Sequence, residues 1–225
     1  MSTEELSSSS QEVEISSSSL TWDNEQGHFR SAQELNVALG RGVNFSNALD
    51  APTEGDWGPA LKEEWFPLAK EMGFDHIRLT VRWNNKAADE APYLIDSVFM
   101  DRVQWAVDLA LGNDLMVVLD MHHYDEIYKD YSTEKPKLLG MWKQIAKQFE
   151  KYSDELIFEA LNEPRDAIGE TEWNELFNEA IVVIRESNPR RSLVVGTTNW
   201  GAISGLEALE LPQDSKEKQW TTVSN

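Results

Sequence analysis

The chain has 225 residues, 40% of them apolar and 10% aromatic, which is enough for one large globular domain with a packed core. Forty acidic residues against twenty basic ones give a formal net charge of -20, which repels phosphate groups and disfavours a nucleic acid or an anionic membrane as partner. No cysteine is present, which excludes a disulfide framework, a thiolate nucleophile and a cysteine-ligated metal.

The N-terminal region divides into two segments. Residues 1–19 contain two runs of four serines mixed with glutamates, too polar to offset the entropy of ordering the chain, so we expect them to be disordered. Residues 20–39 are expected to be a linker or a short cap over the bottom of the domain that follows. The start of the chain lacks the basic and apolar regions of a signal peptide, and no later stretch has the length of a membrane span.

From residue 40 to residue 225, short β-prone runs alternate with stretches of helical spacing. The predicted strands are residues 42–49, 76–83, 116–123, 156–164, 192–200 and 220–225. Apolar residues at steps of three and four predict helices around 61–72, 99–110, 138–152 and 173–184. In the first of these helices, the spacing predicts a buried face made of Leu61, Trp65, Leu68 and Met72.

Alternating strands and helices predict parallel strands and an α/β fold. The strand spacing is near the roughly 31 residues expected when about 250 residues are shared among the eight units of a TIM (β/α)8 barrel. Because about six of the eight units are found and the chain ends within or just after a strand, we expect an incomplete, C-terminally truncated barrel. A doubly wound open sheet is the alternative, but the first βα turn has no GxGxxG or Walker pattern, so we expect no nucleotide cofactor.

Polar residues follow the predicted strands at their carboxyl ends, where (β/α)8 barrels place their working groups. In chain order these are Asn47 and Asp50, Arg78, His122 and His123, Asn162 and Glu163, and Trp200. Amides and imidazoles bind sugar hydroxyls, flat aromatic rings stack on pyranose faces, and a carboxyl group can protonate a leaving oxygen. The set therefore predicts carbohydrate chemistry, with Glu163 as the proton donor and acceptor.

Four side chains have alternative interpretations, one of which is Trp200, which could stack on a sugar ring or on the next helix. Arg78, if it points inward, is expected to keep Glu163 or a neighbouring carboxylate ionised, or to form a core ion pair with no catalytic role. His122 and His123 are adjacent, and adjacent residues on a strand point to opposite faces, so we expect that they do not share a metal ion and that no metal is bound. Asp120 shares a face with His122, but no third ligand is evident; His123 could also pack outside the barrel wall.

The chain resembles glycoside hydrolase family 5, the cellulase family of (β/α)8 barrels. The matching stretches are GRGVNFSNALDAPTEGDWG, HIRLTVRW, VVLDMHHY, FEALNEP, ESNPRRSLVVGTTNWG and LEALELP, which appear in family order. The resemblance implies a retaining endoglucanase acting on β-1,4-glucan, with mannan or mixed-linkage glucan as further substrates, no cofactor, and a secreted location. It implies general acid/base catalysis by Glu163, a centre completed by Asn162, His122 and Arg78, and substrate contacts from Asn47, Asp50, His123 and Trp200.

The chain departs from the family pattern in three places. Asp50 stands where relatives often have glutamate, and Arg165 and Asp166 follow Pro164 where a His-Gly pair is familiar. The family nucleophile follows strand seven, and we expect it to lie beyond this chain, which alone would be inactive.

Other acids are poor substitutes for that nucleophile. Glu207 and Glu210 are predicted in a helix and Glu217 precedes a strand, so none should come within the roughly 5–5.5 Å of Glu163 that a retaining pair needs. Asp50 or Asp125 could serve only an inverting reaction. The alternatives are a non-catalytic or inactive glucan-binding fragment and, less favoured, a metal-dependent barrel hydrolase; no obligate protein partner is inferred.

Overall fold

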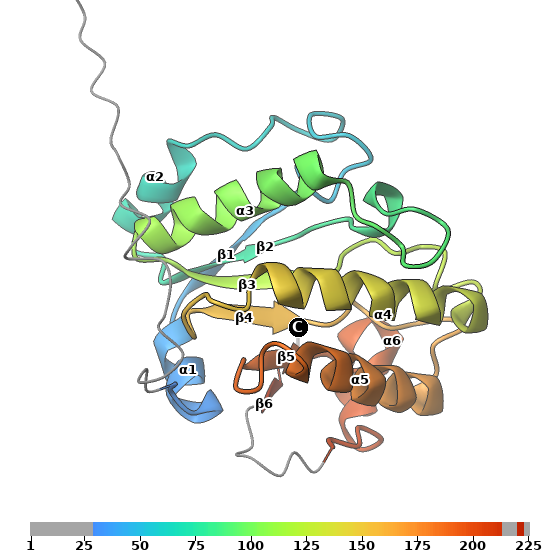
Figure 1. The fold of residues 1–225 in the computed structure, drawn as a ribbon. Coiled ribbons are helices and arrows are strands. Elements are labelled where there is room, and N and C mark those ends of the chain that lie inside the picture. Colours follow the sequence, from blue (N-terminus) through green and yellow to red (C-terminus); the bar gives the residue numbers. More distant parts are fainter. Residues whose placement is uncertain (1–28, 213–219, 223–225) are drawn as a thin grey trace, which may run out of the picture.

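The computed structural model describes residues 29–212 and 220–222, and its centre is a six-stranded parallel sheet (Figure 1). Each strand pairs with the next one along the chain. The strands are β1 (Gly42–Phe45), β2 (His76–Leu79), β3 (Met116–Asp120), β4 (Leu156–Glu159), β5 (Leu193–Val195) and β6 (Trp220–Thr222). Sequential order without a reversal excludes the doubly wound alternative and is the arrangement of an incomplete (β/α)8 barrel, as predicted.

The strands are shorter than predicted: in β3 and β4 regular pairing ends at a buried acid, Asp120 or Glu159, before the polar residues that were expected to end the strand. β4, for example, was expected to reach Pro164 but ends at Glu159, and β3 ends at Asp120 rather than at His123. The functional candidates therefore lie mostly in the loops that leave the strands. Because these residues lie outside the strands, their side chains need not alternate between the two faces of the sheet.

Helices connect the strands and cover one face of the sheet (Figure 1). None of the helices in the described part of the chain is long and apolar enough to cross a membrane. Aspartates cap two of the longer helices: Asp96 accepts a hydrogen bond from the backbone of Phe99, and Asp130 from that of Thr133. The helical segments are α1 (Ala32–Leu39), α2 (Trp65–Glu71), η2 (Asn84–Lys86), α3 (Ser97–Gly112), α4 (Tyr131–Gln148), α5 (Glu170–Arg185), α6 (Thr198–Gly201) and η3 (Ile203–Leu206).

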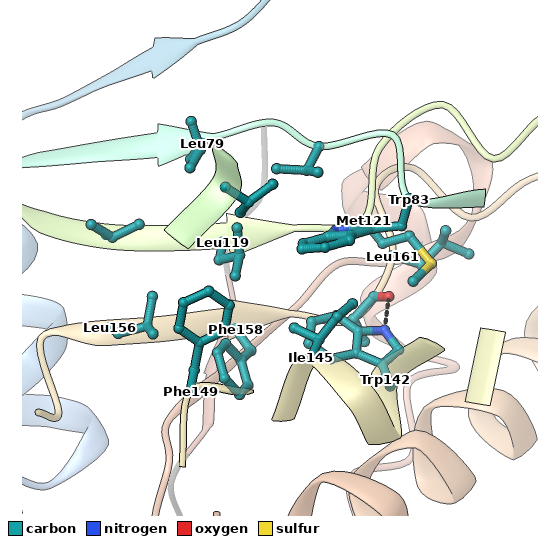
Figure 2. Packing of buried hydrophobic residues seen from close by; sticks show 14 of the residues in the cluster. Leu79, Trp83, Leu119, Met121, Trp142, Ile145, Phe149, Leu156, Phe158 and Leu161 are labelled. Atoms are coloured by element: carbon teal, nitrogen blue, oxygen red, sulfur yellow. Dashed lines mark hydrogen bonds between the residues drawn. The ribbon is translucent and has the colours of Figure 1, made fainter. Parts of the chain in front are cut away.

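The main hydrophobic core lies between the outer face of the sheet and these helices. Leu79, Leu119, Phe158 and Leu193 are paired in register across four strands, and all are fully buried. Trp142 of α4 packs on this row and donates a hydrogen bond from Nε1 to the backbone carbonyl after β4, at 2.8 Å (Figure 2). This row holds the carboxyl ends of β2 to β5 in fixed positions relative to one another.

The inner face of the sheet is covered at its amino-terminal end by α1. A capping box between Ser31 and Glu34 starts this helix, and Leu35 and Leu39 pack against inward-facing apolar residues of the strands. The strand residues in this second cluster are Met116, Val118, Ile157 and Val194. The segment 20–39 was expected to be a linker or a cap; residues 20–28 of it and the segment 1–19 lie outside the described residues.

Arg191, just before β5, ties the entry of β4 to the end of α4. Its guanidinium is fully buried and donates hydrogen bonds to the backbone carbonyls of Phe149, Tyr152, Ser153 and Leu156. Burial lowers the pKa of Arg191 to about 9, with the nearby Asp154 charge acting against this. The side chain satisfies carbonyl groups that would otherwise be buried without partners.

The predicted buried face around α2 is confirmed for Leu61, which is buried, and for Trp65, which packs on the core, but it is wrong for Leu68 and Met72. Leu68 and Met72 are 48% and 61% exposed, whereas Phe66 is fully buried and Ala69 is 5% exposed. This short helix carries two apolar stripes one residue apart, and helical spacing alone does not decide between them. Packing decides, because Phe66 contacts the rings of Phe45 and Trp105 at centroid distances of 5.2 and 5.8 Å.

The assignment of this face can be tested with two variants of the same helix. Phe66→Ala should lower the free energy of unfolding by about 3–5 kcal/mol, because it leaves a cavity in the core. Leu68→Ala, at an exposed position, should lower it by less than about 1 kcal/mol. Urea denaturation followed by circular dichroism gives both values, and equal losses would contradict the observed face.

Candidate active site

The predicted site residues lie in or just after the strands at their carboxyl ends, and two of them, Asn162 and Glu163, gather around the guanidinium of Arg78 in β2. Its Nε and Nη2 donate to the two carboxylate oxygens of Glu159 at 2.7 and 2.8 Å, and Nη2 also lies 2.6 Å from Oδ2 of Asp120. A further hydrogen bond of 2.9 Å reaches Oδ1 of Asn162. Arg78 therefore links β2 to the ends of β3 and β4.

Burial and charge act in opposite directions on this cluster. Burial lowers the pKa of Arg78, but the carboxylates of Asp120 and Glu159 outweigh it, so that pKa is raised above its ordinary value. Burial raises the pKa of Glu159, and the hydrogen bond and charge of Arg78 act in the opposite direction. The negative charge of Asp120, which shares the same guanidinium, raises this pKa further. The cation remains charged, and it compensates carboxylates that could not be buried alone.

Asp120 is fully buried and orients His122. Its Oδ1 accepts a hydrogen bond from the backbone of Val81 at 3.0 Å, and its Oδ2 lies 2.7 Å from Nδ1 of His122. Burial lowers the pKa of His122, but the hydrogen bond and charge of Asp120 act more strongly together, so the pKa is raised. A proton on Nδ1 leaves Nε2 of His122 available to another partner.

Glu163 lies four residues after Glu159, the last residue of β4, and the backbone around it is restrained. Its φ is 48°, in the left-handed region, and the carbonyl of the preceding Asn162 accepts a hydrogen bond from the hydroxyl of Tyr128. The side chain of Glu163 is 37% exposed and lines a cavity of about 280 Å³ together with Arg78, Glu159 and Asn162. Glu163 is thus presented to solvent beside a buried, fully bonded cluster.

Arg165, a departure from the family pattern noted in the sequence, packs against the same turn. Its guanidinium lies 3.8 Å from the ring centre of Tyr128 and donates to the backbone carbonyl of Glu163 at 3.1 Å. It also lies 3.8 Å from Oε2 of Glu163 and 3.8 Å from Asp125. A cation stacked on an aromatic ring therefore lies between two carboxylates of the rim, the name used below for the loops at the carboxyl ends of the strands.

The expectation that His122 and His123 point to opposite faces is wrong. Their ring centres are 4.3 Å apart, because the strand has ended at Asp120 and His123 takes a φ of 53°. His123 therefore does not pack outside the barrel wall; its Nε2 lies 3.6 Å from Oδ2 of the buried Asp50. Burial lowers the pKa of His123, and the neighbouring His122 and Arg82 act in the same direction.

The loop after β1 supplies the other wall of this histidine pair. Trp57 is 46% exposed and meets the ring of His123 edge-on, with centroids 5.2 Å apart. Asp50 is 1% exposed, and its Oδ1 accepts a hydrogen bond from the backbone of Ala48 at 3.0 Å. Asn47, by contrast, is exposed and has a φ of 63°.

Trp200 lies on the loop after β5. The segment α6 is not a regular helix, since Asn199 and Trp200 have φ values of 56° and 60°, each of which costs roughly 1–3 kcal/mol for a residue other than glycine. The backbone of Trp200 donates to the carbonyl of Pro164 at 3.4 Å, and its side chain is 55% exposed. An exposed indole thus stands next to the turn that carries Glu163.

Other acids considered from the sequence are placed as follows. Asp125 pairs with Arg82 at 3.0 Å. Glu207 is the residue that ends the short η3 segment, and Glu210 lies after it, so the prediction that both are in a helix is wrong. Glu217 lies outside the described residues.

Sequence reasoning missed three residues of the site: Glu159, Asp120 as a partner of Arg78, and Trp57. A signal for the first existed, because Glu159 stands between the apolar residues Phe158 and Ala160 in a strand buried on both faces. Charged residues are almost never fully buried unless paired, so a glutamate in a buried strand indicates a cationic partner, although the sequence does not say which one. For Trp57 no local pattern distinguishes a rim position from a loop position.

The role of Asp120 in setting the charge of His122 can be measured. Asp120→Asn should lower the pKa of His122, because it removes the carboxylate that stabilises the imidazolium. Nuclear magnetic resonance titration of histidine-labelled protein gives this pKa. The exposed Asp166→Asn is the control and should leave the titration of His122 unchanged.

The same shift has a defined effect on stability. Because the folded-state pKa of His122 is raised, its protonation contributes stability that is fully present below the unfolded-state pKa and is lost as pH rises through the folded-state pKa. This contribution should shrink in Asp120→Asn. A His122 titration identical in the two proteins would contradict the assigned hydrogen bond.

Comparison with known proteins gives a family match over most of the chain. Residues 38–223 match the model of the family described as Cellulase (glycosyl hydrolase family 5). Endoglucanase H of Acetivibrio thermocellus is 34% identical over 181 residues, which cover 80% of this chain and 20% of that protein. Endoglucanase B of Ruminococcus albus is 34% identical over 237 residues, covering 93% of this chain and 56% of that protein.

Solved structures show the same likeness. The Cel5A protein of Thermotoga maritima, in a crystal structure with mannotriose, is 42% identical and superposes with a TM-score of 0.81. The match covers 84% of this chain and 61% of that one. The chain therefore spans less than two thirds of the length of each of these relatives.

Proposed function

This chain belongs to glycosyl hydrolase family 5, the cellulase family, and from that premise we propose that its rim carries the general acid/base of a β-1,4-glucan hydrolase, Glu163. The observation that carries the proposal is the placement of Glu163. It is a partly exposed carboxyl group at the end of β4, in a cavity that also contains Arg78 and Asn162. A hydrolase needs such a group to protonate the leaving glycosidic oxygen.

The reaction proposed is a retaining one. Glu163 donates a proton to the glycosidic oxygen as a second carboxylate attacks the anomeric carbon, and it then accepts a proton from the water that cleaves the glycosyl intermediate. Asn162, fixed by Arg78, is assigned to a hydroxyl of the bound sugar. The second carboxylate is assigned to no described residue, since Asp120 and Glu159 are both engaged by Arg78.

Substrate contacts are assigned to both sides of Glu163. Asp50, His122 and His123 form a polar group on one side, and Asn47 lies on the same loop as Asp50. Trp200 is assigned to stacking on a sugar ring from the loop after β5. Glucan is the preferred substrate class, and mannan is retained because a similar protein has been crystallised with mannotriose.

The role of Glu163 can be separated from a merely structural one by the choice of leaving group. In the longest polypeptide that contains this chain and hydrolyses soluble cellulose derivatives, Glu163→Gln should lower kcat by about 10²–10⁴-fold, because proton donation is lost. The loss should be much smaller for the first step on an aryl β-cellobioside whose phenolate leaves without protonation. Asp166→Asn, an exposed neighbouring carboxylate, is the control.

Equal activity of wild type and Glu163→Gln on cellulose derivatives would refute the assignment. An equal loss on both types of substrate would assign Glu163 a structural role instead. Substrate tests on mannan and mixed-linkage glucan, run with the same proteins, decide the preferred polysaccharide.

A second candidate function is glucan binding without hydrolysis by this chain alone. It is favoured because four other carboxylates of the rim, among the described residues, already have positively charged or histidine partners and are therefore poor candidates for the nucleophile. Asp120 and Glu159 are held by Arg78, Asp125 by Arg82, and Asp50 lies beside His123. Binding of the chain to insoluble glucan without release of reducing sugar would support this function.

The exposed indole of Trp200 offers a test of binding in either case. Trp200→Ala should weaken binding to a soluble cello-oligosaccharide by about tenfold, equivalent to ~1.4 kcal/mol, because the stacking surface is lost. Val182→Ala, an exposed apolar residue of α5, should leave the affinity unchanged. Isothermal titration calorimetry measures both, and an unchanged affinity in Trp200→Ala would remove Trp200 from the binding surface.

A further inference from the structure

Three side chains at the rim have the composition and spacing of a metal site. Asp50, His122 and His123 each place one ligand atom within 4.8 Å of the others. They come from two different loops, which follow β1 and β3, and so are brought together only by the fold. Two imidazoles and one carboxylate form a donor set that suits Zn²⁺ and related divalent ions.

We propose that Asp50, His122 and His123 bind one divalent transition-metal ion, of which Zn²⁺ is the best match, and that this ion competes with sugar for the rim. The competition rests on the proposed function, whereas the metal binding does not. Three protein ligands leave a fourth position for water, as in open zinc sites.

One pair of donor atoms already has nearly the separation that a zinc site needs, and all three lie within 4.8 Å of one another. Tetrahedral Zn²⁺ with ligands at about 2.0–2.1 Å holds its donor atoms roughly 3.4 Å apart. The Oδ2 atom of Asp50 and the Nε2 atom of His123 are already 3.6 Å apart. The remaining adjustment falls on His122, whose ring already contacts that of His123 at a centroid distance of 4.3 Å.

The surroundings hold each ligand in place. Asp120 accepts the hydrogen bond of Nδ1 of His122, and Arg78 fixes Asp120 in turn. A histidine ligand whose other nitrogen donates to a carboxylate is the usual arrangement around protein-bound zinc. This contact fixes the ring and leaves Nε2 as the metal-binding nitrogen.

The other two ligands are also restrained. Asp50 uses Oδ1 for the backbone of Ala48, which leaves Oδ2 directed toward His123. His123 is held edge-on by Trp57 and is 35% exposed, so an ion can reach the group from solvent. The site therefore combines ordered ligands with access.

Zn²⁺ binding to the 225-residue chain can be measured by calorimetry in a buffer that does not bind zinc. Because a net charge of -20 attracts cations weakly at many places, the result depends on matched variants. Wild type should bind one ion more tightly than all others. His123→Asn and Asp50→Asn should each weaken the binding of this ion by at least about 10–100-fold, because losing only a hydrogen-bond partner of a metal ligand already costs that much affinity.

These substitutions are chosen to preserve the fold. Asparagine tolerates the positive φ of His123, and at position 50 it keeps the oxygen that accepts from Ala48. His76→Gln is the control, because the ring of His76 bonds to the carbonyl of Leu39 away from the cluster. Its zinc affinity should equal that of wild type.

Two further measurements decide the geometry. Co²⁺ in place of Zn²⁺ should give the visible absorption of a tetrahedral site and quench the fluorescence of Trp57, a quenching that is absent in Trp57→Phe. Unchanged zinc isotherms in His123→Asn and Asp50→Asn, or no ion bound more tightly than the rest, would overturn the proposal.

Competition is tested separately with a cello-oligosaccharide. Zn²⁺ should weaken sugar binding to wild type and, by reciprocity, sugar should weaken zinc binding by the same factor. Zinc bound through His123 with sugar affinity unchanged would overturn the competition and remove these three residues from the proposed sugar contacts, while the metal site itself would stand.

Discussion

The rim of this protein depends on the charge of Arg78. Asp120 and Glu159 reach the same point from neighbouring strands, and both are buried. Two buried carboxylates without a cation would repel each other, and removing one partner of such a group typically costs about 3–5 kcal/mol. The guanidinium makes their approach possible, and through Asp120 and Asn162 it also sets the positions of His122 and of the turn that carries Glu163.

A second constraint acts on the backbone just beyond the strands. Asn47, His123, Glu163 and Trp200 all have positive φ, which is uncommon for residues other than glycine. Each of these residues follows the end of a strand. The left-handed conformation there gives the side chain a direction other than the one that the alternation between the two faces of the sheet would have given it. Contacts offset this strain, as where Arg165 donates to the carbonyl of Glu163.

The two faces of the sheet divide stability and chemistry. The outer face carries rows of apolar residues that pack on α3, α4 and α5. Figure 2 shows the part of this packing that involves α4. The inner face is apolar at its amino-terminal end, under α1, and charged at its carboxyl end, around Arg78. This division matches the general behaviour of (β/α)8 barrels, whose catalytic groups lie at the carboxyl ends of the strands.

The sequence by itself determined the order of the six strands and of helices α2 to α5, the parallel arrangement of the strands and the candidates for the rim. This was possible because hydrophobic periodicity reports whether a segment is a strand or a helix, and parallel strands bring their carboxyl ends together. Glu163 was identified as a candidate in this way.

Only the tertiary structure decided which groups meet. The bond between Arg78 and Glu159 joins residues 81 positions apart, through a register that no local pattern encodes. The shared side of His122 and His123 depends on where β3 ends, and the buried face of α2 depends on what Phe66 packs against. Periodicity fixes a side chain's direction only within its own element, whereas its partners come from the packing of distant elements.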